Sequence, residues 1–178
     1  MKLRLLPIVL SVAISAIVLF GGWFVYQSVA MENPLTEVIN NTPGVELVNT
    51  HITNGKAELE LKLQPGTNLR EVYSRIQKEG AEILGDRVFA VKVVNESSPE
   101  IDSWWSSALF DVAQSMETRQ YAEIPKNLQE RAAASGGSIN VSTEMDDKYV
   151  YIALTDGEKS KYVMLPRTPT LMGVWPNE

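Results

Sequence analysis

The chain has 178 residues with 16 Lys and Arg, 22 Asp and Glu, one His and no Cys, which gives a formal net charge of −6 at pH 7. Without Cys the chain has no disulfide bond, no thiol nucleophile and no lipid-modified cysteine. All 22 acidic residues and 14 of the basic ones follow residue 30, so this part carries 14 minus 22, or −8. Nucleic acid and anionic headgroups are therefore disfavoured as partners, because this part would repel both.

The first 30 residues combine Lys2 and Arg4 with an uncharged, apolar run over 5–26. At about 1.5 Å per residue, a helix of this length measures about 33 Å and crosses a hydrocarbon core of about 30 Å. The next basic residue is Lys56, so the positive-inside rule predicts a cytoplasmic N-terminus and a C-terminal domain outside. Residues 1–30 are expected to be the cytoplasmic N-terminus and a single-pass transmembrane signal anchor in the cell membrane.

A cleavable signal peptide is the alternative, because Ser28 and Ala30 place small residues at the two positions that signal peptidase reads. The apolar core of a signal peptide usually has about 7 to 15 residues, which is shorter than this run. The length favours an uncleaved anchor and leaves cleavage after Ala30 open.

Residues 31–165 are expected to form one exported domain, because this length is that of an ordinary domain with a full core. With no disulfide, packing alone must stabilise the domain, which suits an anchored bacterial protein better than a small secreted animal domain. Residues 166–178 contain three Pro and one Gly and are expected to form an irregular C-terminal tail, with Leu171, Met172 and Trp175 as surface anchors.

The exported part begins with a short helix predicted from Asn33, a residue that favours helix N-termini, to a breaker at 42–44. The segment 45–52 is rich in β-branched residues and predicts a strand. Asn54-Gly55 follows, and this dipeptide is typical of tight hairpin turns. The sequence therefore predicts a β-hairpin here.

The partner strand is predicted at 56–63, where apolar and charged residues alternate, so one face is core and the other faces water. The apolar set is Ala57, Leu59, Leu61 and Leu63. Asn68, with Glu71 three residues later, indicates a capping box for a helix that we expect to end at Gly85. The apolar run 88–94 predicts a central strand covered on both faces.

Two further helices are predicted next. Ser98 and Pro99 open the first of them, and Pro125 starts a shorter one that Gly136-Gly137 stops. The expected buried stripe of the longer helix is Ile101, Trp104 or Trp105, Ala108, Leu109, Val112 and Met116.

The last third predicts three strands at 139–145, 149–154 and 162–165, joined by turns at Asp146-Asp147 and Asp156-Gly157. Strands joined by such tight turns are antiparallel. The predicted fold class is α+β: an N-terminal transmembrane helix followed by one exported domain with helices packed on a largely antiparallel sheet.

The Asn54-Gly55 turn, the alternation of Leu59, Leu61 and Leu63, and the passage from helix into strand at 85–91 stand in a characteristic order. In this order of elements the segment 33–94 resembles the BON domain and the ring-building motif of secretion and sporulation channel proteins. The resemblance implies a helix, a hairpin, a helix and a returning strand. It also implies a module that binds lipid, peptidoglycan or copies of itself, and that is not an enzyme.

Residue types that carry catalysis are scarce. The only His is His51, on a predicted strand, so a Ser or Thr nucleophile has no usual base and a His-based metal site has no second ligand. Glu144, Asp146 and Asp147 cluster at a turn, but they lack the alternating oxygen ligands of a calcium loop, and acids are common turn formers. We expect no catalytic residues, no metal and no cofactor.

Trp104 and Trp105 are the candidate binding residues. Adjacent helix residues point about 100° apart, so if one ring is buried the other is expected at the border of the apolar stripe, where it is exposed. A broad buried face under a sheet, with both rings in the core, is the simpler interpretation and stays open beside this one. An exposed Trp is suited to contact a glycan, a peptide or a partner subunit.

Two functions remain. The first is a membrane-anchored extracytoplasmic binding or assembly module that contacts a protein partner, itself or the cell wall. The second is a cell-wall glycan hydrolase that uses two carboxylates from 96–111 beside the tryptophans, about 5 to 9.5 Å apart. A pilin-like subunit is disfavoured, because the acidic residue expected just inside the apolar segment is missing and Gly21-Gly22 lies too late for processing.

Overall fold

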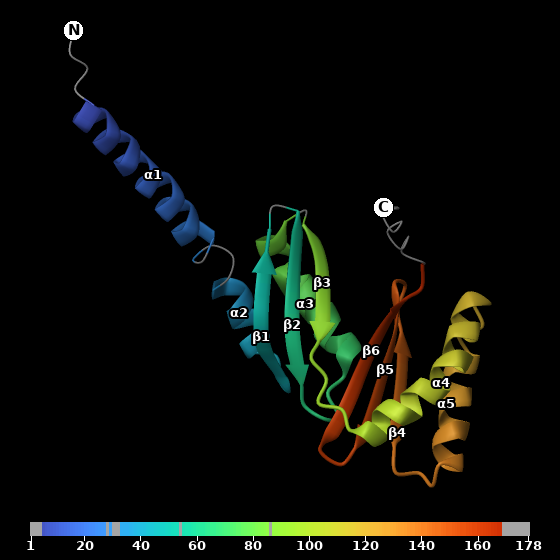
Figure 1. Cartoon of the computed structure of the whole chain (residues 1–178). Coiled ribbons are helices and arrows are strands. Elements are labelled where there is room, and N and C mark those ends of the chain that lie inside the picture. The colour runs from blue at the N-terminus through green and yellow to red at the C-terminus, as the bar shows by residue number, and fades with distance from the viewer. Residues whose placement is uncertain (1–4, 28, 30–32, 54, 86, 169–178) are drawn as a thin grey trace, which may run out of the picture.

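The structure, a computed structural model, describes residues 5–27, 29, 33–53, 55–85 and 87–168. Asn54 of the predicted turn and the predicted tail anchors Leu171, Met172 and Trp175 lie outside the described residues. The elements, in chain order, are α1 (Leu5–Gln27), α2 (Asn33–Asn40), β1 (Val45–Ile52), β2 (Lys56–Leu63), α3 (Leu69–Leu84), β3 (Val88–Val93), α4 (Pro99–Glu117), α5 (Glu123–Ala134), β4 (Asn140–Met145), β5 (Tyr149–Asp156) and β6 (Lys159–Pro166) (Figure 1).

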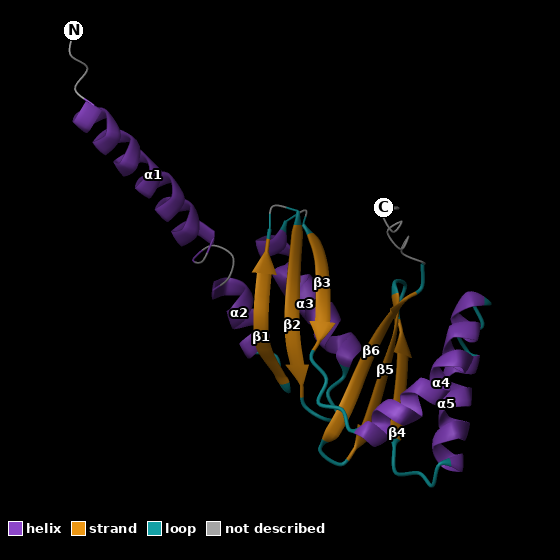
Figure 2. Cartoon of the chain, in the orientation of Figure 1, coloured by secondary structure: helices purple, strands orange, loops and turns teal. Residues whose placement is uncertain are grey.

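The predicted α+β class is confirmed, and the strands are divided between two three-stranded sheets (Figure 2). In the first sheet, β2 pairs antiparallel with β1 and parallel with β3, and α3 makes the crossover between the two parallel strands. In the second sheet, β4, β5 and β6 form the predicted antiparallel meander. The sequence indicated the strands correctly, but not that they build two sheets.

Strand β2 has the predicted register. Its apolar residues are buried under α2 and α3, and its charged residues form ion pairs on the open face of the sheet. Lys92 Nζ lies 2.6 Å from Glu60 Oε1, and Lys62 Nζ lies 2.8 Å from Glu96 Oε1. The buried residues are Ala57, Leu59, Leu61 and Leu63.

Helix α3 also begins and ends as predicted. The Asn68 side chain accepts a hydrogen bond from the backbone N–H of Glu71 at 3.1 Å, which satisfies one donor of the first turn. Gly85 ends the helix with φ at +57°, a conformation that favours glycine. Its N–H donates to the carbonyl of Ala81.

Strand β3 corrects the prediction of a central strand. It lies at the edge of its sheet and, among the described residues, pairs with β2 alone. Phe89 and Val91 pack against the core, whereas Val88 is 67% exposed and Val94 is 38% exposed. The prediction was wrong because a continuous apolar run has no periodicity that separates a central strand from an edge strand with apolar outer residues.

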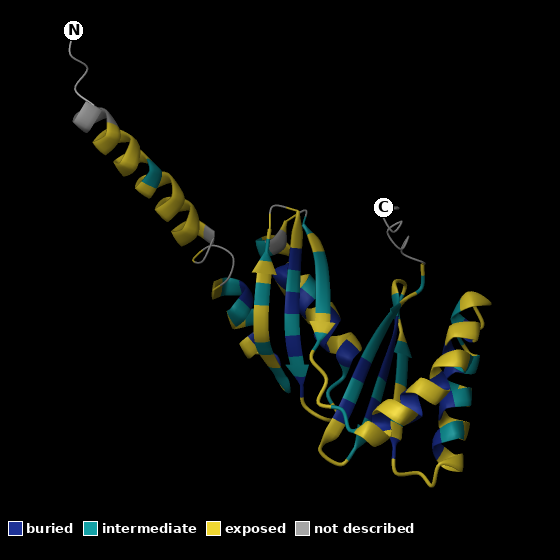
Figure 3. Ribbon diagram, in the orientation of Figure 1, coloured by how far each residue is buried: buried dark blue, intermediate teal, exposed yellow. Residues whose placement is uncertain are grey.

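The strands of the second sheet carry buried residues (Figure 3), and these residues belong to two hydrophobic clusters, one on each face of the sheet. Ile152 and Leu154 face the cluster formed with α4 and α5, while Tyr151 faces the core of the first sheet. Tyr73 of α3 lies edge-on to Tyr149, with 5.3 Å between ring centroids. Tyr73 also stacks on Phe89 of β3, with 5.5 Å between ring centroids, so the two sheets are joined by one aromatic cluster.

Candidate functional site

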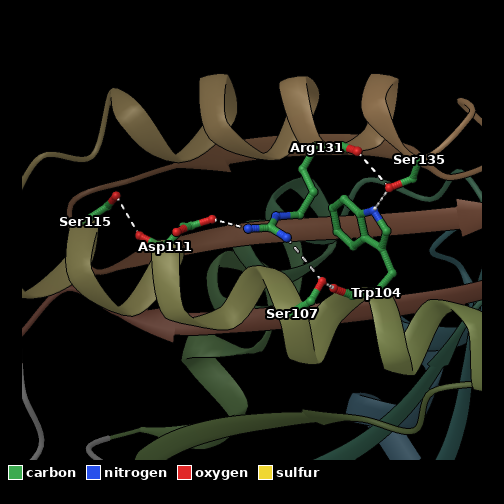
Figure 4. Close-up of polar contacts among 6 residues, drawn as sticks. All are labelled: Trp104, Ser107, Asp111, Ser115, Arg131 and Ser135. Carbon is green, nitrogen blue, oxygen red and sulfur yellow. Dashed lines mark hydrogen bonds and ion pairs between the residues drawn. The ribbon is translucent and has the colours of Figure 1, made fainter.

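Trp104 and Trp105 both lie inside the layer formed by α4 and α5, and their exposed fractions are 8% and 9%. Trp104 Nε1 donates to Oγ of Ser135, the residue directly after α5, at 3.2 Å, and Ser135 Oγ in turn donates to the carbonyl of Arg131 at 2.8 Å (Figure 4). The expectation that one tryptophan is exposed is therefore wrong. Ligand binding by either ring stays a prediction.

Both rings are buried because α4 has two neighbours. One side of α4 faces the second sheet, and another side faces α5, so the buried arc of α4 is wider than a single apolar stripe. The sequence shows the residues of one helix, but not that a second helix covers its flank. The structure thus supports the broad buried face that the sequence left as the alternative.

A polar network holds α4 against α5. Arg131 of α5 forms an ion pair with Asp111 of α4, with 2.5 Å between Nη2 and Oδ2, and its Nη1 donates to Ser107 Oγ at 3.4 Å. Ser107 Oγ donates to the carbonyl of Trp104 at 2.7 Å. The orientation of α4 is therefore supported by side chains from both helices.

A cavity of about 390 Å³ adjoins this network and is lined by Asp111, Asn127, Glu130, Arg131 and Ala134. It contains two carboxylates and one guanidinium. One carboxylate, that of Asp111, already pairs with the guanidinium. The cavity therefore combines one ion pair, the second carboxylate of Glu130 and a single amide, and its lining contains no nucleophile of the Ser, Thr or Cys type.

The acids expected for glycan hydrolysis form other contacts. Asp102 Oδ1 lies 2.7 Å from Lys161 Nζ, and hydrogen bonds from Lys161 and Ser97 hold the pKa of Asp102 below its ordinary value. The ion pair with Lys62 lowers the pKa of Glu96 in the same way. A glycosidase acid needs a raised pKa, so these contacts give the hydrolase hypothesis no support.

The turn acids stabilise the β4–β5 hairpin. Asp146 Oδ1 accepts hydrogen bonds from the backbone N–H groups of Lys148 and Tyr149. Asp146 Oδ2 accepts a hydrogen bond from the Tyr151 hydroxyl at 2.6 Å. Partial burial raises the pKa of Asp146, but these hydrogen bonds outweigh it and lower the pKa overall. In the part of the chain that the structure describes, no group of three His, Cys, Asp or Glu side chains is arranged to hold a metal ion.

The outer side of α4 exposes apolar residues that the sequence analysis did not identify as a site. Phe110 is 80% exposed and Leu109, which was expected in the buried stripe, is 43% exposed. We define the α4 outer face as Ser103, Ser106, Leu109, Phe110, Ala113 and Gln114. All six are exposed and uncharged. The signal was present in the sequence, because Phe110 lies on the opposite side of the helix from the predicted stripe.

Comparisons of the chain with protein-family models, with curated proteins and with solved structures found no match.

Proposed function

We propose that the chain is a single-pass, membrane-anchored binding or assembly module whose folded part lies outside the cytoplasm and contacts a protein partner through the α4 outer face. The exposure of Phe110 in the middle of the α4 outer face, whose side chains are uncharged between Asp102 and Glu117, carries this proposal. The BON-like resemblance of 33–94, a segment with the expected order of elements, agrees with a binding role.

The anchor is α1. Its segment Val9–Tyr26 has a mean hydropathy of 2.1, is long enough to cross a membrane and buries nothing against the rest of the described chain. Trp23 and Tyr26, 53% and 55% exposed, lie near its C-terminal end, where aromatic side chains favour the membrane interface. Lys2 and Arg4 precede the helix, which favours a cytoplasmic N-terminus. A signal sequence cleaved after Ala30 is the alternative for this segment.

A fusion after Glu178 tests the orientation. Alkaline phosphatase is expected to be active there, because this enzyme requires an oxidising compartment outside the cytoplasm to form its disulfides. A cytoplasmic fluorescent reporter at the same position is the matched control and is expected to be dark. The reverse pattern would place the folded part inside the cell. The mass of the membrane-bound chain separates an intact anchor from cleavage after Ala30.

The α4 outer face is suited to a protein partner. Burial of the Phe110 ring contributes about 1.5–3 kcal/mol, and the neighbouring Ser106 and Ala113 are small enough to allow a close approach. The buried tryptophans and the Arg131 network hold α4 in place, so little conformational entropy is lost on docking. Rigid aromatic anchors of this kind dominate the binding energy of protein interfaces.

A substitution at Phe110 tests the proposal. Phe110→Ser is expected to remove the protein that copurifies in stoichiometric amount with the tagged, detergent-solubilised chain, without changing its melting temperature. Val88→Ser is the matched control, because Val88 is 67% exposed on the edge of the first sheet, away from α4. Retention of the partner by Phe110→Ser, or its loss from both variants, would exclude the α4 outer face as the docking site.

A further inference from the structure

A second site lies between the start of α3 and the second sheet. It is a cleft of about 270 Å³, and its wall is formed by residues 66–70, at the start of α3. Its floor is formed by three cross-strand pairs of β4 and β5: Asn140 with Thr155, Ser142 with Ala153, and Glu144 with Tyr151.

The cleft exists because side-chain size changes along the sheet. At the end of the cleft near Tyr73, the rings of Tyr149 and Tyr151 pack against the Tyr73 ring and fill the space between α3 and the second sheet. At the other end the floor consists of short side chains, those of Ser142 and Ala153 among them, which leave the space open. The fold thus produces a hollow where its two sheets approach each other.

The charges in the cleft cancel. Glu144 Oε1 accepts a hydrogen bond from Asn68 Nδ2, and Glu144 Oε2 accepts one from Arg70 Nε, both at 3.0 Å. Each carboxylate oxygen of Glu144 therefore has a partner. Cation binding is disfavoured, because the Glu144 carboxylate is already paired. Anion binding is also disfavoured, because Glu144 already neutralises the Arg70 guanidinium and this part of the chain has an excess of acidic residues. The cleft is suited to an uncharged ligand.

The floor also offers hydrogen bonds. Asn140 and Ser142 are exposed and Thr155 is half-buried, and among the described residues their side chains make no hydrogen bond to another side chain or to the backbone. An apolar ligand would remove these groups from water without compensation, which costs free energy. Ala153 and Leu69 add a small apolar contact area beside them.

We infer that this cleft binds one ring of an uncharged, polyhydroxylated ligand, which is a sugar, either free or as a unit of a glycan chain. The hydroxyl groups of the ring would pair with Asn140, Ser142 and Thr155. Its C–H groups would contact Ala153 and Leu69. This binding site is separate from the α4 outer face and does not depend on the proposed function.

The test uses the full chain in nanodiscs of an uncharged lipid and measures binding of N-acetylglucosamine and of its linear tetramer by calorimetric titration. Saturable binding of either sugar is expected. Tighter binding of the tetramer indicates a glycan chain, and equal binding indicates a free sugar. Ser142→Leu fills the floor and is expected to weaken binding at least tenfold. Ser74→Leu, the same change at an exposed serine outside the cleft, is expected to leave binding unchanged.

Asn140→Ala is a second variant that removes hydrogen bonds without adding bulk, and severalfold weaker binding is expected. Circular dichroism confirms that each variant is folded. No saturable binding of either sugar, or equal affinity of the original chain and both cleft variants, would overturn the inference. Phe110→Ser is expected to bind sugar with the affinity of the original chain, because Phe110 lies outside the cleft. Loss of the protein partner and loss of sugar binding are therefore distinguishable.

Discussion

Trp105→Ala is expected to lower the free energy of unfolding by about 3–5 kcal/mol. The ring is only 9% exposed and belongs to the cluster that joins α4 and α5 to Ile152 and Leu154 of the second sheet. Removing it leaves a cavity between three elements that are held in place by other contacts. Chemical denaturation of the chain in detergent micelles, followed by circular dichroism, measures this change.

Phe110→Ala is the matched control, since it removes an aromatic ring from the same helix at a position that is 80% exposed. Its effect on the free energy of unfolding is expected to stay within about 0.5 kcal/mol. If the two substitutions had equal, small effects, Trp105 would not be a core residue. The sequence interpretation of the Trp pair as an exposed contact site would then be restored.

Leu61→Ala is expected to cost about 2–5 kcal/mol, because Leu61 is fully buried under α2 and α3. Glu60→Ala, one residue away on the open face, is expected to cost about 1 kcal/mol at most. It loses a surface ion pair with Lys92, whose side chain is 63% exposed, and exposed pairs contribute little. The same denaturation measurement compares the two variants. Similar losses would contradict the register of β2.

The elements that the sequence predicted best are those whose signals are local. Strand β2 follows from a strict alternation of apolar and charged residues, and α3 follows from Asn68, Glu71 and Gly85 at its ends. In each case the residues that determine the element lie within it or directly beside it. Neither depends on the rest of the chain for its identification.

The features that the sequence did not predict depend on distant neighbours. Strand β3 lies at an edge because nothing in the described chain pairs with its outer side, and the burial of both tryptophans depends on α5. The cleft between the start of α3 and the second sheet brings Arg70 beside Glu144, and these two residues are 74 positions apart in the chain. The exposure of Phe110 was also not predicted, but it does not depend on distant neighbours. The helical periodicity alone places Phe110 opposite the buried stripe of α4.

Photo-crosslinking from position 110 tests the central claim most directly. A benzoylphenylalanine in place of Phe110, activated in intact membranes, is expected to give one discrete adduct, with a second protein or with another copy of the chain. The same group in place of Val88 is expected to give none. The absence of an adduct at position 110, or the same adduct from both positions, would contradict a docking site on the α4 outer face.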